Sequence, residues 1–381
     1  MTVRQQRRGE QIRIARERFH LTQEQLGEFV DLSAQDIDAI ERGERSARGD
    51  AFERIAYAVG RKTWEFVDQD FVDDGELAAL FRSTSQPTAR MQLTRSLQEG
   101  IAYALQFSSL EGRIGNNRAA ALRPALHLPA PCDRAEATCQ GELAAIEERE
   151  RLNLGDRDLY RMQHLFETNG VGSVAVSLPD NVCGVTLFDP RFGAFVLFNA
   201  AQSRTRRRFS LAHEYGHVLM DRHRLASLSK IGPPEDLIEL RADAFAAAFL
   251  MPEGGVLHAI DRPAGKAIGL LEIAAVAQAF GVSRRSALRR IRHLQLVSAI
   301  EFDALSAQEA NGEGEPYSTL LGMFNAPETD SRKESRGRML SLALEVYRQE
   351  RISRGKLREI GEEFGFSREA IAGLIDVLSM E

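Results

Sequence analysis

The sequence has 381 residues, of which 43% are hydrophobic and 27% are charged, a balance that excludes a largely disordered chain. At about 150 residues per domain, this length predicts two to three domains. Lysine and arginine number 49 against 55 acidic residues, a net charge of −6, which excludes a uniformly basic nucleic-acid coat protein but allows a local basic patch. With three cysteines and no apolar run near the ~20 residues of a membrane span, we expect a cytoplasmic protein without a membrane segment.

Residues 1–66 carry the pattern of short amphipathic helices joined by tight turns. Thr22 stands three residues before Gln25, the spacing of a capping box, and Ser33 is an N-cap candidate for the next helix. Gly43 follows as a helix stop.

Residues 67–135 are expected to form a helical connector. Helical patterns occur near Glu76–Arg82 and in Ala89–Leu105. The proline-containing stretch Leu122–Asp133 then indicates a domain boundary.

Residues 136–260 differ from the helical segments before them, because patterns typical of strands appear between the helical ones. The helices are predicted over Glu136–Arg151, Leu159–Asn169, 207–222 and 235–250. The strands are predicted over Val171–Ser177, Val182–Phe188 and Ala194–Phe198. The fold class expected is therefore mostly α with a small β-sheet (α+β).

Residues 265–381 are again helical by pattern. Phe280-Gly281-Val282-Ser283 and Phe364-Gly365-Phe366-Ser367 each lie between two short amphipathic helices, as Val30-Asp31-Leu32-Ser33 does near the N-terminus. Each has the shape of a helix-turn-helix unit. Between the last two, residues 310–316 (ANGEGEP) are expected to form a flexible linker.

The strongest chemical signal is His213-Glu214-Tyr215-Gly216-His217. Residues four apart on a helix share a face, so both imidazoles can reach one metal ion. Glu214 follows the first histidine and can hold a water molecule beside the metal and take its proton. A helix with two surface histidines is the alternative interpretation.

A catalytic zinc site needs a third protein ligand and an open fourth position. Glu239 is the preferred candidate, because Asp243 lies four residues later on the same helix face and can accept the outer N–H of a ligating histidine. His223 is the other candidate, but the spacing it would use requires a glycine where this chain has Met220.

The runs RRRFSLAHEYGHVLM and IELRADAFAAAFLMPE resemble the ImmA/IrrE metallopeptidases over about residues 136–260. The resemblance implies a gluzincin-like metallopeptidase core that binds Zn²⁺. It implies His213, His217 and Glu239 as metal ligands and Glu214 as general base, and Asn199 also matches a family position. It further implies a protein substrate, a helix-turn-helix repressor whose cleavage releases a set of genes.

The run LTQEQLGEFVDLSAQDIDAIERGERS resembles the XRE/Cro-type helix-turn-helix domains over about residues 8–66. The resemblance implies a double-stranded operator as partner. A second copy of the chain, in a homodimer, is a further candidate partner. The residues expected to contact DNA are Gln23, Ser33, Gln35, Arg42 and Arg8, with Gln35 as the best reader of adenine.

Two features depart from that family. Asp31 replaces the usual turn glycine, and Asp36 and Asp38 make the recognition helix acidic. Residues 1–50 hold 9 basic against 10 acidic residues, so we expect weak, salt-sensitive DNA binding. A helical module that binds protein instead of DNA is the alternative.

Two further features carry hypotheses. The arginines Arg284, Arg285, Arg289, Arg290 and Arg292 either form a nucleic-acid patch, where single-stranded DNA could act as an activator, or lie on a solvated helix face. Cys183, in the second predicted strand, is either a buried structural residue or a thiol that reaches the metal.

Because the metal motif is intact, the preferred function is a DNA-binding zinc endopeptidase that regulates transcription by cleaving a helix-turn-helix repressor under stress or phage-related signals. The alternatives are a regulator whose peptidase-like domain only senses a ligand or partner, and the regulatory half of a toxin–antitoxin or phage-immunity pair.

Overall fold

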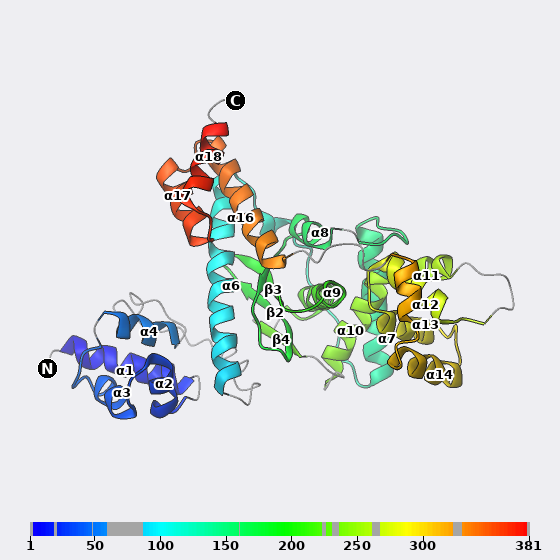
Figure 1. Ribbon diagram of the computed structural model, residues 1–381, viewed down its shortest axis with the longest axis horizontal. Coiled ribbons are helices and arrows are strands. Elements are labelled where there is room, and N and C mark those ends of the chain that lie inside the picture. Colours follow the sequence, from blue (N-terminus) through cyan, green and yellow to red (C-terminus); the bar gives the residue numbers. More distant parts are fainter. Residues whose placement is uncertain are drawn as a thin grey trace.

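The computed structural model describes residues 3–18, 21–47, 49–58, 87–159, 161–222, 226–230, 236–260, 267–322 and 330–378. Within these ranges the chain is mostly helical with one small sheet, as the sequence predicted (Figure 1). Glu76–Arg82, where a helix was expected, lies outside the described residues.

Four short helices form a bundle at the N-terminus (Figure 1). They are α1 (Val3–Arg18), α2 (Gln23–Val30), α3 (Ala34–Glu41) and α4 (Asp50–Ala58). Their apolar faces meet in a core of their own, to which Ile12, Leu26, Ile37 and Ile55 each contribute a fully buried side chain. The helical periodicity of the sequence predicts such faces at Ile12, Leu26 and Ile37, and the structure adds Ile55 of α4.

The predicted caps are present in this bundle. Thr22 accepts a hydrogen bond from the backbone N–H of Gln25, whose side chain accepts from the backbone N–H of Thr22. Ser33 and Asp36 form the same reciprocal pair at the start of α3. Asp31, which replaces the usual turn glycine, ends α2 in the left-handed conformation with φ 55°.

Four strands form the sheet, in the order β1-β3-β2-β4. They are β1 (Val171–Val176), β2 (Val182–Asp189), β3 (Gly193–Asn199) and β4 (Ala226–Lys230). β1 and β3 are parallel, whereas β2 pairs antiparallel with β3 and with β4. The sequence predicted the first three strands but not β4.

Both faces of the sheet are covered by helices (Figure 1). On one face, Val196 and Phe198 of β3 pack with α8 (Met162–Thr168) and α9 (Arg204–Met220). On the other face, Phe195 and Leu197 pack with α6 (Pro87–Arg113) and α16 (Ser331–Arg348). Successive side chains of β3 point to opposite faces of the sheet. Because helices cover both faces, the strand is buried from Ala194 to Asn199.

α6 is more than a connector. It has 27 residues and extends the helix expected over Ala89–Leu105 at both ends. Leu93 and Leu97 are buried against the sheet, and Gly100 lies so close to Leu197 of β3 that a Cβ would come within 2.2 Å of it. The core of the sheet therefore includes helices on both sides of residues 136–260.

The remaining helices lie in two groups, one beyond α9 and one, formed by the last two helices of the chain, beside α16 (Figure 1). They are α7 (Arg134–Arg151), α10 (Leu237–Leu250), α11 (Glu253–Ala259), α12 (Leu270–Phe280), α13 (Arg284–His293), α14 (Ala299–Ala310), α15 (Glu315–Leu320), α17 (Arg354–Glu363) and α18 (Arg368–Leu378). A 3₁₀ turn, η2 (Arg118–Ala121), precedes α7. α10 packs against both α7 and α9, so α9 lies between the sheet and α10 (Figure 1).

The prediction of a flexible linker at residues 310–316 was wrong. The segment is a tight turn that leads into α15, and Gly314 is buried beside Glu309 and Arg284. Arg284 holds the turn by ion pairs with Glu309 and Glu315, so a composition rich in glycine and glutamate is ordered here by long-range contacts. Among the described residues, no helix combines the length and apolarity needed to cross a membrane.

Candidate metal centre

The imidazoles of two histidines on α9 converge on one point between α9 and α10. His213 and His217 lie one turn apart, so both side chains leave the same face of the helix, toward α10. Both are buried, and their Nε2 atoms are 3.1 Å apart. Gly216, between them, lets the helices approach, because a Cβ there would lie 2.9 Å from the ring of Phe245.

Glu239 joins the two histidines from the first turn of α10. Its Oε2 lies 3.2 Å from His213 Nε2, and its Oε1 lies 3.3 Å from His217 Nε2. One donor atom from each of these residues lies within 4.8 Å of the other two. Asp236 caps α10 and accepts the backbone N–H of Glu239, which fixes the turn that presents this side chain.

The other nitrogen of each imidazole is bound to a carboxylate. His213 Nδ1 lies 2.8 Å from Asp243 Oδ1, and His217 Nδ1 lies 2.8 Å from Asp221 Oδ2. Arg241, which is buried, holds Asp221 in turn through a 2.5 Å hydrogen bond. A carboxylate at Nδ1 keeps the proton there and leaves the Nε2 lone pair available to a metal.

This set of donors fits a metal ion. Burial lowers the pKa of both histidines, but the carboxylates around them outweigh it, so the pKa of His217 is raised to about 9 and that of His213 is raised as well. Burial raises the pKa of Glu239, yet the two imidazoles bring it well below its usual value. Positive charge between the three side chains of His213, His217 and Glu239 therefore stabilises this arrangement. Two imidazoles, one carboxylate and an open fourth side are typical of catalytic metal sites.

Glu214 follows His213 on α9, and its side chain contacts β2. Its Oε2 accepts a 2.6 Å hydrogen bond from Thr186, while its Oε1 is buried and has no partner among the described residues. A Cβ at Gly184 would lie 2.6 Å from that Oε1, so the glycine makes room for the carboxylate. Burial raises the pKa of Glu214, which suits a carboxylate that must accept a proton near neutral pH.

Family comparisons agree with this geometry. Residues 177–292 match the family model described as the IrrE N-terminal-like domain, a peptidase family, and residues 12–63 match the model described as helix-turn-helix. The chain is a fusion of these two kinds of domain. Its helix-turn-helix domain supports DNA binding, and the IrrE-like domain supports a peptidase-like role, so the chain is a regulator with a peptidase-like domain. A comparison with curated proteins found no match.

The IrrE-like domain brings together the predicted residues His213, His217 and Glu239, with Asp243 beside them. His223, the alternative ligand, lies outside the described residues. Asn199 contacts the β1–β2 connection and not the group: its side chain donates to the carbonyl oxygens of Leu178, Pro179 and Val182, at 3.0 to 3.3 Å.

Sequence reasoning missed three residues around the group. Asp221 is four residues after His217, so helical spacing alone could have indicated that it contacts this histidine. Thr186 and Gly184 meet Glu214 only because β2 packs on α9, and no local sequence signal could have found them.

The residues expected to contact DNA differ in their surroundings. Gln35 is exposed at the start of α3. Arg8 is half-buried, with its guanidinium 4.8 Å from the centre of the Phe52 ring. Ser33 is occupied in capping α3, although its position at the helix start leaves the side chain exposed.

The acidic residues of α3 are paired within the bundle. Asp36 forms an ion pair with Arg45, and Asp38 forms one with Arg42 at 2.6 Å. The Gln23 side chain donates to Asp38 at 3.1 Å, so it is partly committed to the bundle. These contacts reduce the negative charge that α3 presents and occupy Arg42.

The five arginines of the α13 segment do not form one face. Arg284 is held by the two glutamates of the α14–α15 turn, and Arg290 is buried and donates to a backbone carbonyl at 3.1 Å. Arg292 also donates to a carbonyl oxygen, at 3.2 Å. Arg285 and Arg289 are exposed and, within the described ranges, have no hydrogen-bond or ion-pair partner.

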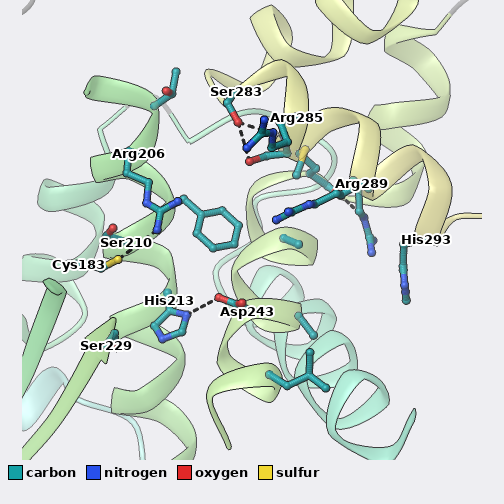
Figure 2. Close-up of a pocket in the computed structure, with 18 of the residues that line it drawn as sticks. Cys183, Arg206, Ser210, His213, Ser229, Asp243, Ser283, Arg285, Arg289 and His293 are labelled. Atoms are coloured by element: carbon teal, nitrogen blue, oxygen red, sulfur yellow. Dashed lines mark hydrogen bonds and ion pairs between the residues drawn. The ribbon is translucent and has the colours of Figure 1, made fainter. Parts of the chain in front are cut away.

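Cys183 is buried on β2, in a cavity that also includes His213 (Figure 2). Arg206 of α9 donates to its sulfur at 3.3 Å. The thiol therefore lines the same cavity as His213, one of the three candidate ligands, and is held by a cation.

Proposed function

We propose that the chain is a DNA-binding zinc endopeptidase that regulates transcription by cleaving a helix-turn-helix repressor. The observation that carries this proposal is the convergence of His213, His217 and Glu239 beside Glu214, whose Oε1 is buried without a partner in the described part of the chain. The match of residues 177–292 to a peptidase family supports it.

In this proposal His213, His217 and Glu239 hold Zn²⁺, and Asp243 and Asp221 orient the imidazoles. When bound, the ion would polarise the scissile carbonyl and lower the pKa of a water molecule. Glu214 would take the proton of the attacking water and pass it to the leaving amide nitrogen, while Thr186 holds the carboxylate in position.

The substrate would enter through the cavity shown in Figure 2, which has a volume of about 580 Å³. His213 and Asp243 form part of its wall, so a peptide bound there would lie beside His213, one of the three proposed ligands. A cavity of this size accommodates a few side chains of an extended peptide.

The N-terminal bundle would bind a double-stranded operator through α3, with Gln35 as the exposed reader of a base. Homodimer formation and activation by single-stranded DNA remain parts of this proposal. Joining the two domains would bring the peptidase to the DNA on which its repressor substrate sits.

The test compares the wild type with Glu214→Gln. A neutral amide keeps the shape of Glu214 but cannot accept the proton, so the variant should bind about one Zn²⁺ per chain, by elemental analysis, and lose cleavage. New protein N-termini would be labelled and identified in cells that produce either form. A cut in a helix-turn-helix protein made only by the wild type supports the proposal, and identical N-termini in both cell lines would show that the domain only senses a ligand.

A further inference from the structure

The cavity beside the candidate metal centre has a positively charged wall. α13 contributes Arg285 and Arg289, which are four residues apart and so lie on one face of the helix. α9 contributes Arg206 from the other side of the cavity (Figure 2).

The charge of this wall is not neutralised by the protein. Arg285 and Arg289 have no ion-pair partner among the described residues. The two acidic residues of the lining are already engaged: Glu142 with Arg290 and with His293 at 2.9 Å, and Asp243 with the imidazole of His213. An anion that entered the cavity would therefore meet two uncommitted guanidinium groups.

The rest of the lining suits a peptide better than a nucleic acid. Leu240, Ala244 and Ala247 form an apolar stripe along α10, in the same lining as the arginines, and the buried Met251 follows at the end of the helix. Single-stranded nucleic acids bind along rows of stacking aromatic side chains, whereas this lining is made mostly of small, hydroxyl and aliphatic side chains. Its aromatic rings among the described residues are Phe209 and two imidazoles, and both imidazoles are engaged, His213 with Asp243 and His293 with Glu142. Apolar contacts beside a guanidinium pair fit a segment in which an acidic side chain has apolar neighbours.

We infer that this cavity selects substrates with an aspartate or glutamate in the segment that binds beside the metal ligands. Arg285 and Arg289 would bind that carboxylate, and the apolar stripe of α10 would hold the residues around it. This inference rests on the proposed peptidase function and names the substrate class: acidic peptide segments. In this role Arg285 and Arg289 determine specificity and take no part in the bond-breaking step.

Binding and cleavage would be measured with one probe, an equimolar library of short synthetic peptides with randomised central positions. Immobilised Glu214→Gln protein should retain peptides enriched in aspartate and glutamate. Wild-type protein should cleave peptides that carry an acidic residue at a fixed position near the cut. For an individual acidic peptide, Arg285→Gln/Arg289→Gln should weaken binding by about tenfold, as expected for two partly exposed charge pairs.

The matched control is Arg354→Gln/Arg358→Gln. These two exposed arginines have the same spacing on α17 and the same net change in charge, but lie outside the cavity. The control should leave the acidic preference intact. Arg285→Glu/Arg289→Glu should instead favour peptides with lysine or arginine, which a merely destabilised protein would not do.

The outcomes separate this inference from the proposed function. If no peptide is cleaved but acidic peptides are retained through Arg285 and Arg289, the cavity assignment holds and the peptidase proposal is wrong. If peptides are cleaved without acidic preference, or if the Gln and Glu variants keep the wild-type preference, this inference is wrong. Retention of a single-stranded oligonucleotide in place of peptides, lost in the same double variant, would assign the cavity to nucleic acid and also overturn it.

Discussion

Each histidine of the proposed zinc site is held by a carboxylate at Nδ1, but the two carboxylates differ in their surroundings. Asp221 is buried and is itself bound by Arg241, whereas Asp243 is partly exposed in the wall of the cavity shown in Figure 2. Replacing Asp221 would leave a buried arginine without its partner and affect folding as well as metal binding. Asp243 is therefore the better residue with which to test the role of these carboxylates.

Asp243→Asn should weaken Zn²⁺ binding by about tenfold, because an amide keeps the shape but lowers the basicity of the imidazole that it contacts. The affinity would be measured by competition with a chromogenic chelator. Asp303→Asn, at an exposed carboxylate on α14, is the control and should bind zinc as the wild type does. Equal affinity in both variants would contradict a role for Asp243 at the metal centre.

Gly184→Ala should reduce peptide cleavage without loss of zinc. The added Cβ would lie 2.6 Å from Glu214 Oε1 and 2.8 Å from its Cγ, so the carboxylate must move away from its position beside β2. Cleavage rate and zinc content would be measured on the same preparation. The control is Gly112→Ala, where a Cβ meets nothing within 4 Å, and an unchanged rate in the Gly184 variant would show that Glu214 does not need this position.

At the scale of the elements, the turn between α2 and α3 is a local weakness. Asp31 adopts a left-handed conformation that costs a side-chain-bearing residue free energy, and its negative charge lies at the C-terminal end of α2, where the helix dipole is also negative. Its backbone N–H still bonds to the carbonyl of Gly27, so the turn keeps its shape in spite of the residue.

Asp31→Gly should raise the free energy of opening of α2 and α3 by about 1 kcal/mol, since it removes both unfavourable terms. Hydrogen–deuterium exchange of the backbone amides in these helices would measure the change. Asp31→Asn removes only the charge and should give a smaller gain. Faster exchange in the glycine variant would mean that the Asp31 side chain stabilises the turn.

The sequence predicted an element well where that element depends on residues close to it in the chain. The capping residues Thr22 and Ser33 and the histidine spacing on α9 each depend on neighbours within four residues. β4 escaped prediction because it is a short strand that is held at the edge of the sheet by β2, more than 30 residues earlier. Thr186 was missed for the same reason, since its role depends on the packing of β2 against Glu214.

At the scale of the whole molecule, the sheet is the structure that joins the chain together. α16 covers the face opposite α9, and Met339, Ala343 and Val346 are fully buried there. Arg338 of α16 donates to the carbonyl oxygen of Ser173 in β1 at 2.7 Å. The sequence suggested a separate C-terminal region because no periodic pattern shows which distant surface an amphipathic helix will cover.

Deletion of residues 331–381 should lower the melting temperature of the IrrE-like domain by about 10 °C or more, because it exposes one apolar face of the sheet. Differential scanning calorimetry would measure the change. Deletion of residues 1–58, which have a core of their own, is the control: it should leave that transition in place and abolish DNA binding. A C-terminal deletion with an unchanged transition would show that the sheet does not need α16.

The strand order also has a consequence for synthesis on the ribosome. β2 and β3 form an antiparallel pair joined by a short turn, so this hairpin can form as soon as residue 199 has left the exit tunnel. The two histidines emerge next, yet Glu239 and the carboxylate of Asp243 follow only with α10, which packs on α7 and α9. A nascent chain therefore cannot assemble the full set of donors until α10 is made, and the chain would acquire its metal only when most of this domain can already fold.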